Sequence, residues 1–274
     1  MIQSNDAEID RYAAVGTAVA REAGGLLMTH FRTQFSVSHK GAINLVTEVD
    51  VAAEDLIVSR LMREFPGHAV LAEEKHSEGV PAEYRWIVDP LDGTTNYAHG
   101  FAFFSVSMAL EIRGEVVWGA VYNPPLEEMF TARLGRGARC NGAPIRVSST
   151  ATLGESMLAT GFPYDIRTSP INNLDNFRAF ALRALAIRRA GSAALDLSYV
   201  AAGRFDGFWE LKLNPWDVAA GYLIVREAGG TVTDLQGRRG SAYVPECVAS
   251  NGLIHEEMLM VLRSAALTTS QSRP

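Results

Sequence analysis

Apolar residues recur at helical spacing over the first part of the chain. From Ile9 to Leu27 they fall three and four positions apart, the pattern of an amphipathic helix, and we expect a helix over residues 7–31. Residues 47–50 resemble a capping box. A second helix is therefore expected to begin there and to end before the Phe65-Pro66-Gly67 sequence.

Shorter apolar runs come next, and their composition is typical of strands. The runs at 69–72 and 86–88 are each followed by acidic residues, which indicates buried strands with carboxylates at their C-terminal ends. Residues 103–132 alternate between strand and turn signals, and a glycine-rich stretch at 135–142 precedes an expected short strand at 145–147.

Beyond about residue 150 the pattern alternates between strand and helix. The expected elements are strands at 157–160, 186–189, 205–210, 231–234 and 247–250, and helices at 171–185, 192–202, 216–228 and the C-terminus. Strands covered by helices predict an α/β (α+β) layered sandwich. The change of pattern divides the chain into an N-terminal α+β half, residues 1–150, and a C-terminal α/β half, residues 151–274.

Composition and charge restrict the function. The 274 residues carry a formal net charge of -6, which argues against direct nucleic-acid binding or an anionic membrane surface as partner, since both need a basic face. Two cysteines are too few for a disulfide framework or a thiolate zinc site. No apolar run approaches the roughly 20 residues of a membrane span, and there is no signal pattern, so we expect a cytoplasmic protein.

Candidate chemistry gathers around a turn rich in acids. Asp89 and Asp92 follow a hydrophobic strand, and Gly93, Thr94 and Thr95 come directly after them. Acidic residues also follow another strand (Glu73, Glu74) and begin a later helix (Asp217). Oxygen ligands without histidine or thiolate favour Mg²⁺, and such ions would relieve the repulsion among the acids and attract phosphate.

Three other interpretations compete with this one. The acidic turn can be an Asx-turn, and Asp217 can simply cap its helix. The segment from Cys140 to Arg146 has the C-x₅-R spacing of cysteine phosphatases, but Pro144 removes an amide from the loop and a strand is expected after it. The D-x-D-x-T pattern of aspartyl-phosphate enzymes needs acids two apart, whereas Asp89 and Asp92 are three apart. Attack by metal-activated water is the chemistry that remains.

Together these residues resemble a known family, the inositol monophosphatases, over nearly the whole chain. The resemblance rests on Leu71-Ala-Glu-Glu74, on Trp86-Ile-Val-Asp-Pro-Leu-Asp-Gly-Thr-Thr-Asn96, and on Trp216-Asp-Val-Ala-Ala-Gly221, in that order. The segments 189–197 and 203–210 are most similar to its bacterial branch. The resemblance implies an αβαβα sandwich, a homodimer, and lithium-sensitive catalysis with two to three Mg²⁺ ions per subunit.

The resemblance also implies roles for particular residues. The metal ligands would be Glu73, Asp89, the Leu91 carbonyl, Asp92 and Asp217; the catalytic residues Glu73, Thr94 and Asp50; and the substrate contacts Asp92, Gly93, Thr94, Gly191, Ser192, Ala193, Glu210 and Asp217. Loop amides after Asp92 would bind phosphate. The chain departs from the family at Ala72 and Lys75, and the segment between Lys40 and Asp50 is one residue short.

The sequence leaves the substrate open. A small phosphorylated polyol or sugar is expected, with myo-inositol monophosphate first and fructose-1,6-bisphosphate, 3′-phosphoadenosine 5′-phosphate and histidinol phosphate as alternatives. Arg188 and Arg189 either neutralise a second phosphate or form a surface or dimer-interface pair. A bacterial branch of the family is associated with RNA-polymerase and antitermination complexes, so an accessory role in transcription is the alternative of another class.

Overall fold

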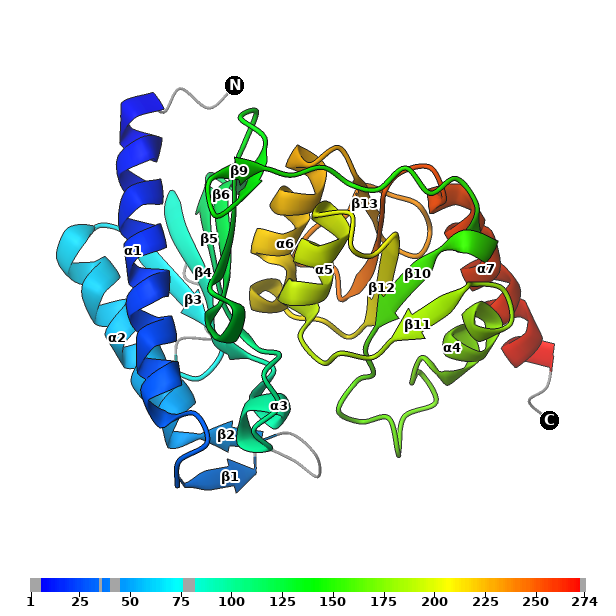
Figure 1. Ribbon diagram of the computed structural model, residues 1–274, viewed down its shortest axis with the longest axis horizontal. Helices are drawn as coiled ribbons and strands as arrows, with labels where there is room; N and C mark the ends of the chain where they lie inside the picture. Colours follow the sequence, from blue (N-terminus) through cyan, green and yellow to red (C-terminus); the bar gives the residue numbers. More distant parts are fainter. Residues whose placement is uncertain (1–5, 35, 40–44, 76–81, 272–274) are drawn as a thin grey trace.

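The computed structural model describes residues 6–34, 36–39, 45–75 and 82–271, and they form five layers, helix, sheet, helix, sheet, helix (Figure 1). The predicted fold class is confirmed. The three helix layers are α1 (Asp6–His30) with α2 (Glu48–Glu64), α5 (Ala193–Ala201) with α6 (Pro215–Glu227), and α4 (Leu174–Ala181) with α7 (His255–Gln271). No helix in these ranges is long and apolar enough to cross a bilayer.

The first sheet has seven strands and lies between two helix layers. In spatial order they are β3 (Ala69–Ala72), β4 (Tyr84–Asp92), β5 (Ser105–Ile112), β6 (Glu115–Asn123), β7 (Glu128–Arg133), β8 (Ala138–Cys140) and β9 (Ala143–Pro144). β3 and β4 are parallel and the other neighbours are antiparallel. Every residue of β5 is buried, because helices cover both faces of the sheet.

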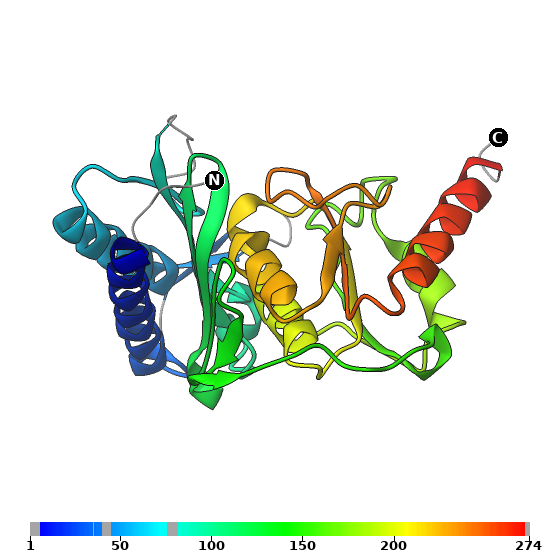
Figure 2. The same cartoon turned by 90° about the horizontal axis from the view of Figure 1, so that it is seen from above.

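The second sheet has five strands, and Figure 2 shows its place beyond α6 from a second direction. In spatial order they are β11 (Ala186–Arg188), β10 (Met157–Thr160), β12 (Gly207–Leu211), β14 (Glu246–Ser250) and β13 (Thr231–Thr233). β10 runs parallel to both β11 and β12, so these three strands present their carboxyl ends at one edge. The proposed division at residue 150 stays a prediction, although each sheet draws its strands from one side of it.

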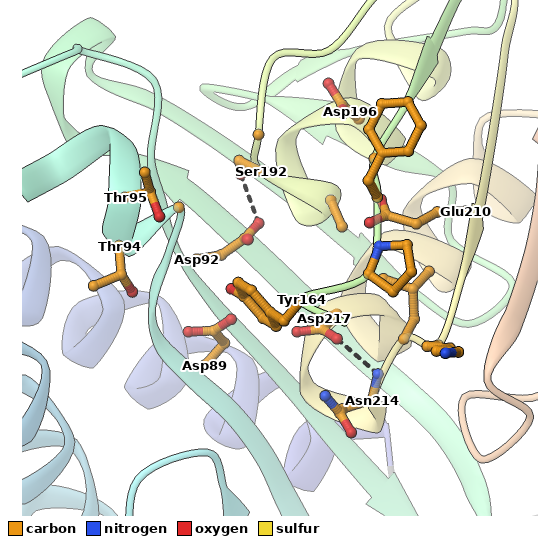
Figure 3. Close-up of a pocket in the computed structure, with 18 of the residues that line it drawn as sticks. Asp89, Asp92, Thr94, Thr95, Tyr164, Ser192, Asp196, Glu210, Asn214 and Asp217 are labelled. Carbon is orange, nitrogen blue, oxygen red and sulfur yellow. Dashed lines mark hydrogen bonds between the residues drawn. The ribbon is translucent and has the colours of Figure 1, made fainter. Parts of the chain in front are cut away.

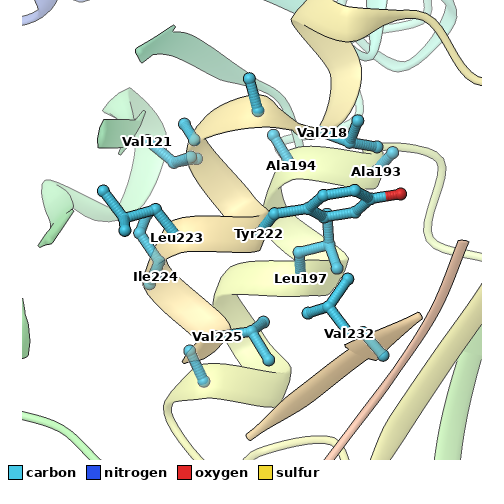
Figure 4. Close-up of a cluster of buried hydrophobic side chains, with 14 of the residues drawn as sticks. Val121, Ala193, Ala194, Leu197, Val218, Tyr222, Leu223, Ile224, Val225 and Val232 are labelled. Atoms are coloured by element: carbon cyan, nitrogen blue, oxygen red, sulfur yellow. The ribbon is translucent and has the colours of Figure 1, made fainter. Parts of the chain in front are cut away.

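The helix pair α5 and α6 is shared by both sheets. Figure 4 shows its buried side chains, with Val121 of β6 on one side and Val232 of β13 on the other. Close approach depends on small residues: a Cβ at Gly221 would lie 2.6 Å from Leu197 Cδ1, and one at Gly119 would lie 2.9 Å from the Ala220 Cα. The packing of this pair therefore fixes the two sheets relative to each other.

Several elements differ from the expectations. Residues 145–147 form no strand; β9 ends at Pro144, and the Val147 amide instead donates to the Ala228 carbonyl at 3.2 Å. α4 begins later than the expected residue 171, because Asn173 before it is left-handed with φ 70°, and it ends at Ala181 instead of 185. A short hairpin of β1 (Val37–His39) with β2 (Leu45–Thr47), and helix α3 (Thr94–Ala98), were not anticipated. Short 3₁₀ turns occupy Pro124–Leu126 and Leu153–Glu155. Lys40 lies outside the described residues.

Candidate active site

A cavity of about 290 Å³ lies where strands of both sheets end. Glu73 follows β3, Asp92 ends β4, and the loop from Gly161 to Tyr164 follows β10. Residues after β11 and β12 and the first turns of α5 and α6 complete the lining. Carboxyl ends of parallel strands and helix N-termini are where open α/β sheets bind ligands. Figure 3 shows the polar side chains of these segments turned toward one space.

Four carboxylates from three distant segments share this cavity. They belong to Glu73, Asp89, Asp92 and Asp217. Asp89 is only 2% exposed, and burial, followed by the negative charges of the other three, raises its pKa well above the ordinary value. Burial also raises the pKa of Asp92, to about 6, against hydrogen bonds that lower it. The cavity therefore holds more negative charge than the protein itself compensates.

Three of these carboxylates accept hydrogen bonds from the protein through one of their oxygens. Asp89 Oδ1 accepts from the Leu91 amide at 2.9 Å, and Asp217 Oδ2 accepts from the Asn214 amide at 2.6 Å. Asp92 Oδ2 accepts from Ser192 Oγ at 2.6 Å and the Ala194 amide at 2.8 Å. The second oxygens of Asp89 and Asp217 have no hydrogen bond within the described ranges, and they remain available to a ligand.

The side-chain atoms of these acids that could coordinate a metal are all oxygen, which suits a hard divalent cation such as Mg²⁺. Uncompensated charge at Asp89 gives such a cation a physical reason to bind. No three acidic, histidine or cysteine side chains of the described chain already converge closely enough to form a complete metal site. The carboxylates would have to turn inward around the ion, with water completing the coordination.

Thr94 connects the cavity to helix α2. Its hydroxyl lies 2.9 Å from Asp50 Oδ1 and 3.1 Å from the Leu91 carbonyl. Asp50 is 1% exposed, and its second oxygen accepts from the Thr47 amide at 2.9 Å and from the Thr47 hydroxyl, as the capping box of α2. Burial raises the pKa of Asp50. Asp50 thus contacts Thr94 and does not line the cavity itself.

The backbone after Asp89 differs from the expected turn. β4 continues to Asp92, with irregular pairing to β5 between Asp89 and Asp92. Gly93 then takes φ 98°, where an added Cβ would lie 3.1 Å from the Phe103 carbonyl and 3.2 Å from the Gly191 carbonyl. Only glycine suits this position, because the backbone is left-handed and two carbonyl groups approach it closely. The bulge turns Asp92 into the cavity beside Asp89.

The other end of the cavity contains Glu210 and Asp196. Burial raises the pKa of Glu210 to about 8, although the charge of Arg189 acts in the opposite direction. A Cβ on Gly161 would lie 2.1 Å from Glu210 Oε1, so glycine there leaves room for the carboxylate. Asp196 is 1% exposed, its Oδ1 has no hydrogen-bond partner in the described residues, and burial raises its pKa well above the ordinary value.

Most of the residues expected from the sequence line this one cavity. They are Glu73, Asp89, Leu91, Asp92, Gly93, Thr94, Gly191, Ser192, Ala193, Glu210 and Asp217. Glu74 does not line it, and its amide donates to Glu54 at 2.7 Å. Arg189 lines the cavity, whereas Arg188 does not. Cys140 also lies elsewhere, and burial raises the pKa of its thiol, the opposite of what a nucleophile needs.

Sequence reasoning missed some residues at the site. Tyr164 and Asp196 both line the cavity. The amide side chain of Asn96 donates to the Phe103 and Ala190 carbonyls at 2.7 and 2.8 Å and so connects the segment before β5 to the segment after β11. Tyr164 comes shortly after the strand expected at 157–160, and its place at a strand's carboxyl end was a usable signal. Asp196 and Asn96 gave no comparable signal, because their environments come from distant segments.

The proteins similar to this chain include inositol monophosphatases and proteins named Nus factor SuhB. The family model described as the inositol monophosphatase family matches residues 8–267. A Pseudomonas aeruginosa protein named Nus factor SuhB is 43% identical over 258 residues, 91% of this chain and 94% of that protein. An inositol-1-monophosphatase of Mesorhizobium japonicum is 42% identical over 247 residues, 89% and 93% of the two chains. The solved inositol monophosphatase of Anabaena (Nostoc) sp. PCC 7120 has a TM-score of 0.86 at 39% identity, covering 94% of this chain and 97% of that one.

Proposed function

The chain belongs to the inositol monophosphatase family, and from this premise we propose that it is a Mg²⁺-dependent phosphomonoesterase that hydrolyses myo-inositol monophosphate to inositol and phosphate. Family membership supports a phosphatase; the metal and the substrate are the proposal. The observation that carries it is Asp89, a buried carboxylate facing three more across one cavity. Such an arrangement is costly unless cations neutralise it.

The proposed ligands are oxygen atoms of residues that line the cavity. Glu73, Asp89 and the Leu91 carbonyl would hold a first ion; Asp89, Asp92 and Asp217 a second; and Glu73 would contribute to a weaker third. When bound, Mg²⁺ supplies positive charge for the phosphate and acidifies water. Backbone amides after Asp92, including those of Gly93 and Thr94, would add hydrogen bonds to the phosphate.

Thr94 is proposed to orient the attacking water. A hydroxyl has one hydrogen, and the contact of 2.9 Å with Asp50 is shorter than the one of 3.1 Å with the Leu91 carbonyl. With that hydrogen donated to Asp50, the lone pairs of Thr94 Oγ1 can accept a hydrogen bond from a water. Asp50 fixes the rotation of the hydroxyl, and Glu73 is proposed to take part as an acceptor for the same water.

The polyol is proposed to occupy the end of the cavity that contains Glu210. Carboxylates accept hydrogen bonds from hydroxyl groups, so Glu210, Asp92 and Asp217 would recognise the ring. The segment of Gly191, Ser192 and Ala193 contributes backbone groups at the start of α5. This arrangement favours an uncharged polyol over a second phosphate at that end.

Phosphate release from a panel of phosphomonoesters tests the proposal. The panel contains myo-inositol 1-phosphate, fructose-1,6-bisphosphate, 3′-phosphoadenosine 5′-phosphate and histidinol phosphate, each with and without Mg²⁺ and lithium. We expect the inositol ester to be preferred, with activity that requires Mg²⁺ and is inhibited by lithium, and none in Asp89→Asn. Strong preference for a bisphosphate would overturn the substrate, and full activity in a chelator would overturn the metal.

A second candidate function comes from the relatives named Nus factor SuhB. We propose as the alternative an accessory role in an RNA-polymerase complex, through protein contacts. Complementation of a deletion strain with Asp89→Asn separates the two: restored growth would favour binding, and failure of a folded variant would favour hydrolysis. A cytoplasmic homodimer is part of both proposals, and light scattering of the purified protein measures the dimer.

A further inference from the structure

The loop after β10 brings an aromatic side chain over the acidic cluster. Phe162, Pro163 and Tyr164 all line the cavity. In Figure 3 the Tyr164 ring lies between Asp89 and Asp217, with Asp92 above it in the view. Tyr164 therefore faces the carboxylate end of the cavity, where the phosphate is proposed to bind.

The hydroxyl of Tyr164 has no hydrogen-bond partner in the described part of the protein. The Tyr164 side chain is 57% exposed, and its hydroxyl makes no hydrogen bond in the portion of the chain that the structure describes. A phenol keeps its proton at neutral pH, so the Tyr164 hydroxyl is a hydrogen-bond donor there.

The residue after Tyr164, Asp165, attaches this loop to the segment after β12. Asp165 Oδ2 lies 2.6 Å from Lys212 Nζ, which also donates to Ser169 Oγ at 2.7 Å. Lys212 has a φ of 60°, a left-handed conformation that is uncommon for a residue with a side chain, and its amide donates to the Pro245 carbonyl at 2.6 Å. Lys212, which itself lines the cavity, thus connects the segment after β12 to the loop that carries Tyr164.

Two other side-chain donors that line the cavity already have partners. The Lys212 ammonium contacts Asp165 and Ser169, and the Thr94 hydroxyl contacts Asp50. The charge of Arg189 acts on Glu210 and Asp196, at the polyol end. Tyr164 is thus a donor in this part of the cavity whose hydrogen has no acceptor in the described chain.

We propose that the Tyr164 hydroxyl donates a hydrogen bond to a phosphoryl oxygen of the bound phosphomonoester and of the product phosphate, and that the Lys212–Asp165 ion pair is the positioning contact that holds it there. This inference rests on the proposed function, because that function assigns phosphate to the carboxylate end. It adds a substrate-binding residue on a loop that carries none of the metal ligands.

The test removes only the hydroxyl. Tyr164→Phe is compared with Tyr84→Phe, because Tyr84 stacks on His68 outside the cavity and its hydroxyl also has no hydrogen bond in the described residues. Calorimetric binding of inorganic phosphate in the presence of Mg²⁺ and its inhibition constant are measured for both. We expect about tenfold weaker phosphate binding in Tyr164→Phe, the effect of one hydrogen bond to a charged group, and no change in Tyr84→Phe.

The positioning role is tested with Lys212→Met, which keeps the length of the side chain and removes its charge. If Lys212 acts through Tyr164, phosphate binding weakens in Lys212→Met, and the double variant binds phosphate as Tyr164→Phe does. Additive losses would mean that Lys212 contacts the phosphate itself and would overturn the positioning role.

Other outcomes separate this inference from the proposed function. Unchanged phosphate binding in Tyr164→Phe overturns the inference, even if the wild-type protein hydrolyses the inositol ester. A higher KM for the ester with unchanged phosphate binding also overturns it, by placing the phenol on the polyol. If the wild-type protein hydrolyses nothing but phosphate binding falls in Tyr164→Phe, the inference holds and the proposed reaction fails.

Discussion

Asp217 shows how one carboxylate contributes to both folding and the site. Its Oδ2 accepts from the Asn214 amide at 2.6 Å in the capping box of α6, while the side chain lines the cavity. Burial raises its pKa well above the ordinary value, against that hydrogen bond. The helix cap that the sequence also allowed is therefore present, and it leaves the second oxygen for a ligand.

Asp217→Asn is predicted to lower turnover by orders of magnitude at an almost unchanged melting temperature. The amide oxygen can still accept from Asn214, and removing one of four like charges relieves repulsion in the metal-free protein. Phosphate release and thermal unfolding in a chelator measure the two quantities. Asp10→Asn, which loses a surface ion pair with Arg133, serves as the control. Near-wild-type turnover would count against Asp217 as a metal ligand.

Helix α2 supports the site at two points one turn apart. Asp50 holds the Thr94 hydroxyl, and Glu54, which is fully buried, accepts from the amides of Glu74 and Lys75 at 2.7 and 2.8 Å. Positions four apart share a helix face, so the helix sets the spacing between the segment after Glu73 and the start of α3. Glu54 is a positioning residue for Glu73 in this arrangement.

Glu54→Gln is predicted to raise the Mg²⁺ concentration for half-maximal activity by about tenfold, with a smaller change in turnover at saturating Mg²⁺. The glutamine NH₂ group would meet a backbone N–H, so one hydrogen bond is lost and Glu73 moves. Mg²⁺ titration by calorimetry gives the affinity directly. The control is Asp55→Asn, which loses only an exposed ion pair with Lys75. An equal loss of affinity in both variants would rule out the positioning role.

For the molecule as a whole, the acids of the cavity link stability to pH. Glu210 has a folded pKa of about 8 against an ordinary value of 4.5, so the folded state binds its proton more tightly. Its contribution to the free energy of unfolding is therefore complete below about pH 4.5 and is lost as the pH rises through about 8. The metal-free protein should become less stable across this window.

Thermal unfolding in a chelator between pH 6 and 9 tests this linkage. We expect the melting temperature of the wild-type protein to fall with rising pH, and the fall to be smaller in Glu210→Gln, which has no titrating group at that position. Glu115→Gln, at the exposed start of β6, should keep the wild-type slope. If Glu210→Gln also keeps that slope, Glu210 is not a source of the pH dependence.

The sequence by itself determined the features that depend only on residues close together in the chain, such as where a helix begins and ends. The expected helices at 7–31 and from residues 47–50 lie within about one residue of α1 and α2, because periodicity and a capping box act over a few positions. The acids after β3 and within β4 were also evident, since their chemistry can be read from residue types. The wrong strand at 145–147 shows the limit, because an apolar run does not say which backbone it pairs with.

Tertiary structure decided which of those groups meet. Packing of α5 and α6 between two sheets brings Asp217, Glu210 and Asp196 to the same cavity as Asp89, and the strand bulge and Gly93 turn Asp92 toward them. Tyr164 faces the acids from a loop whose next residue, Asp165, forms an ion pair with Lys212 of another segment. Burial and raised pKa values depend on distances between segments that are remote in the sequence. The residue types therefore determined which chemistry was available, and the packing of the layers determined which residues meet in the cavity.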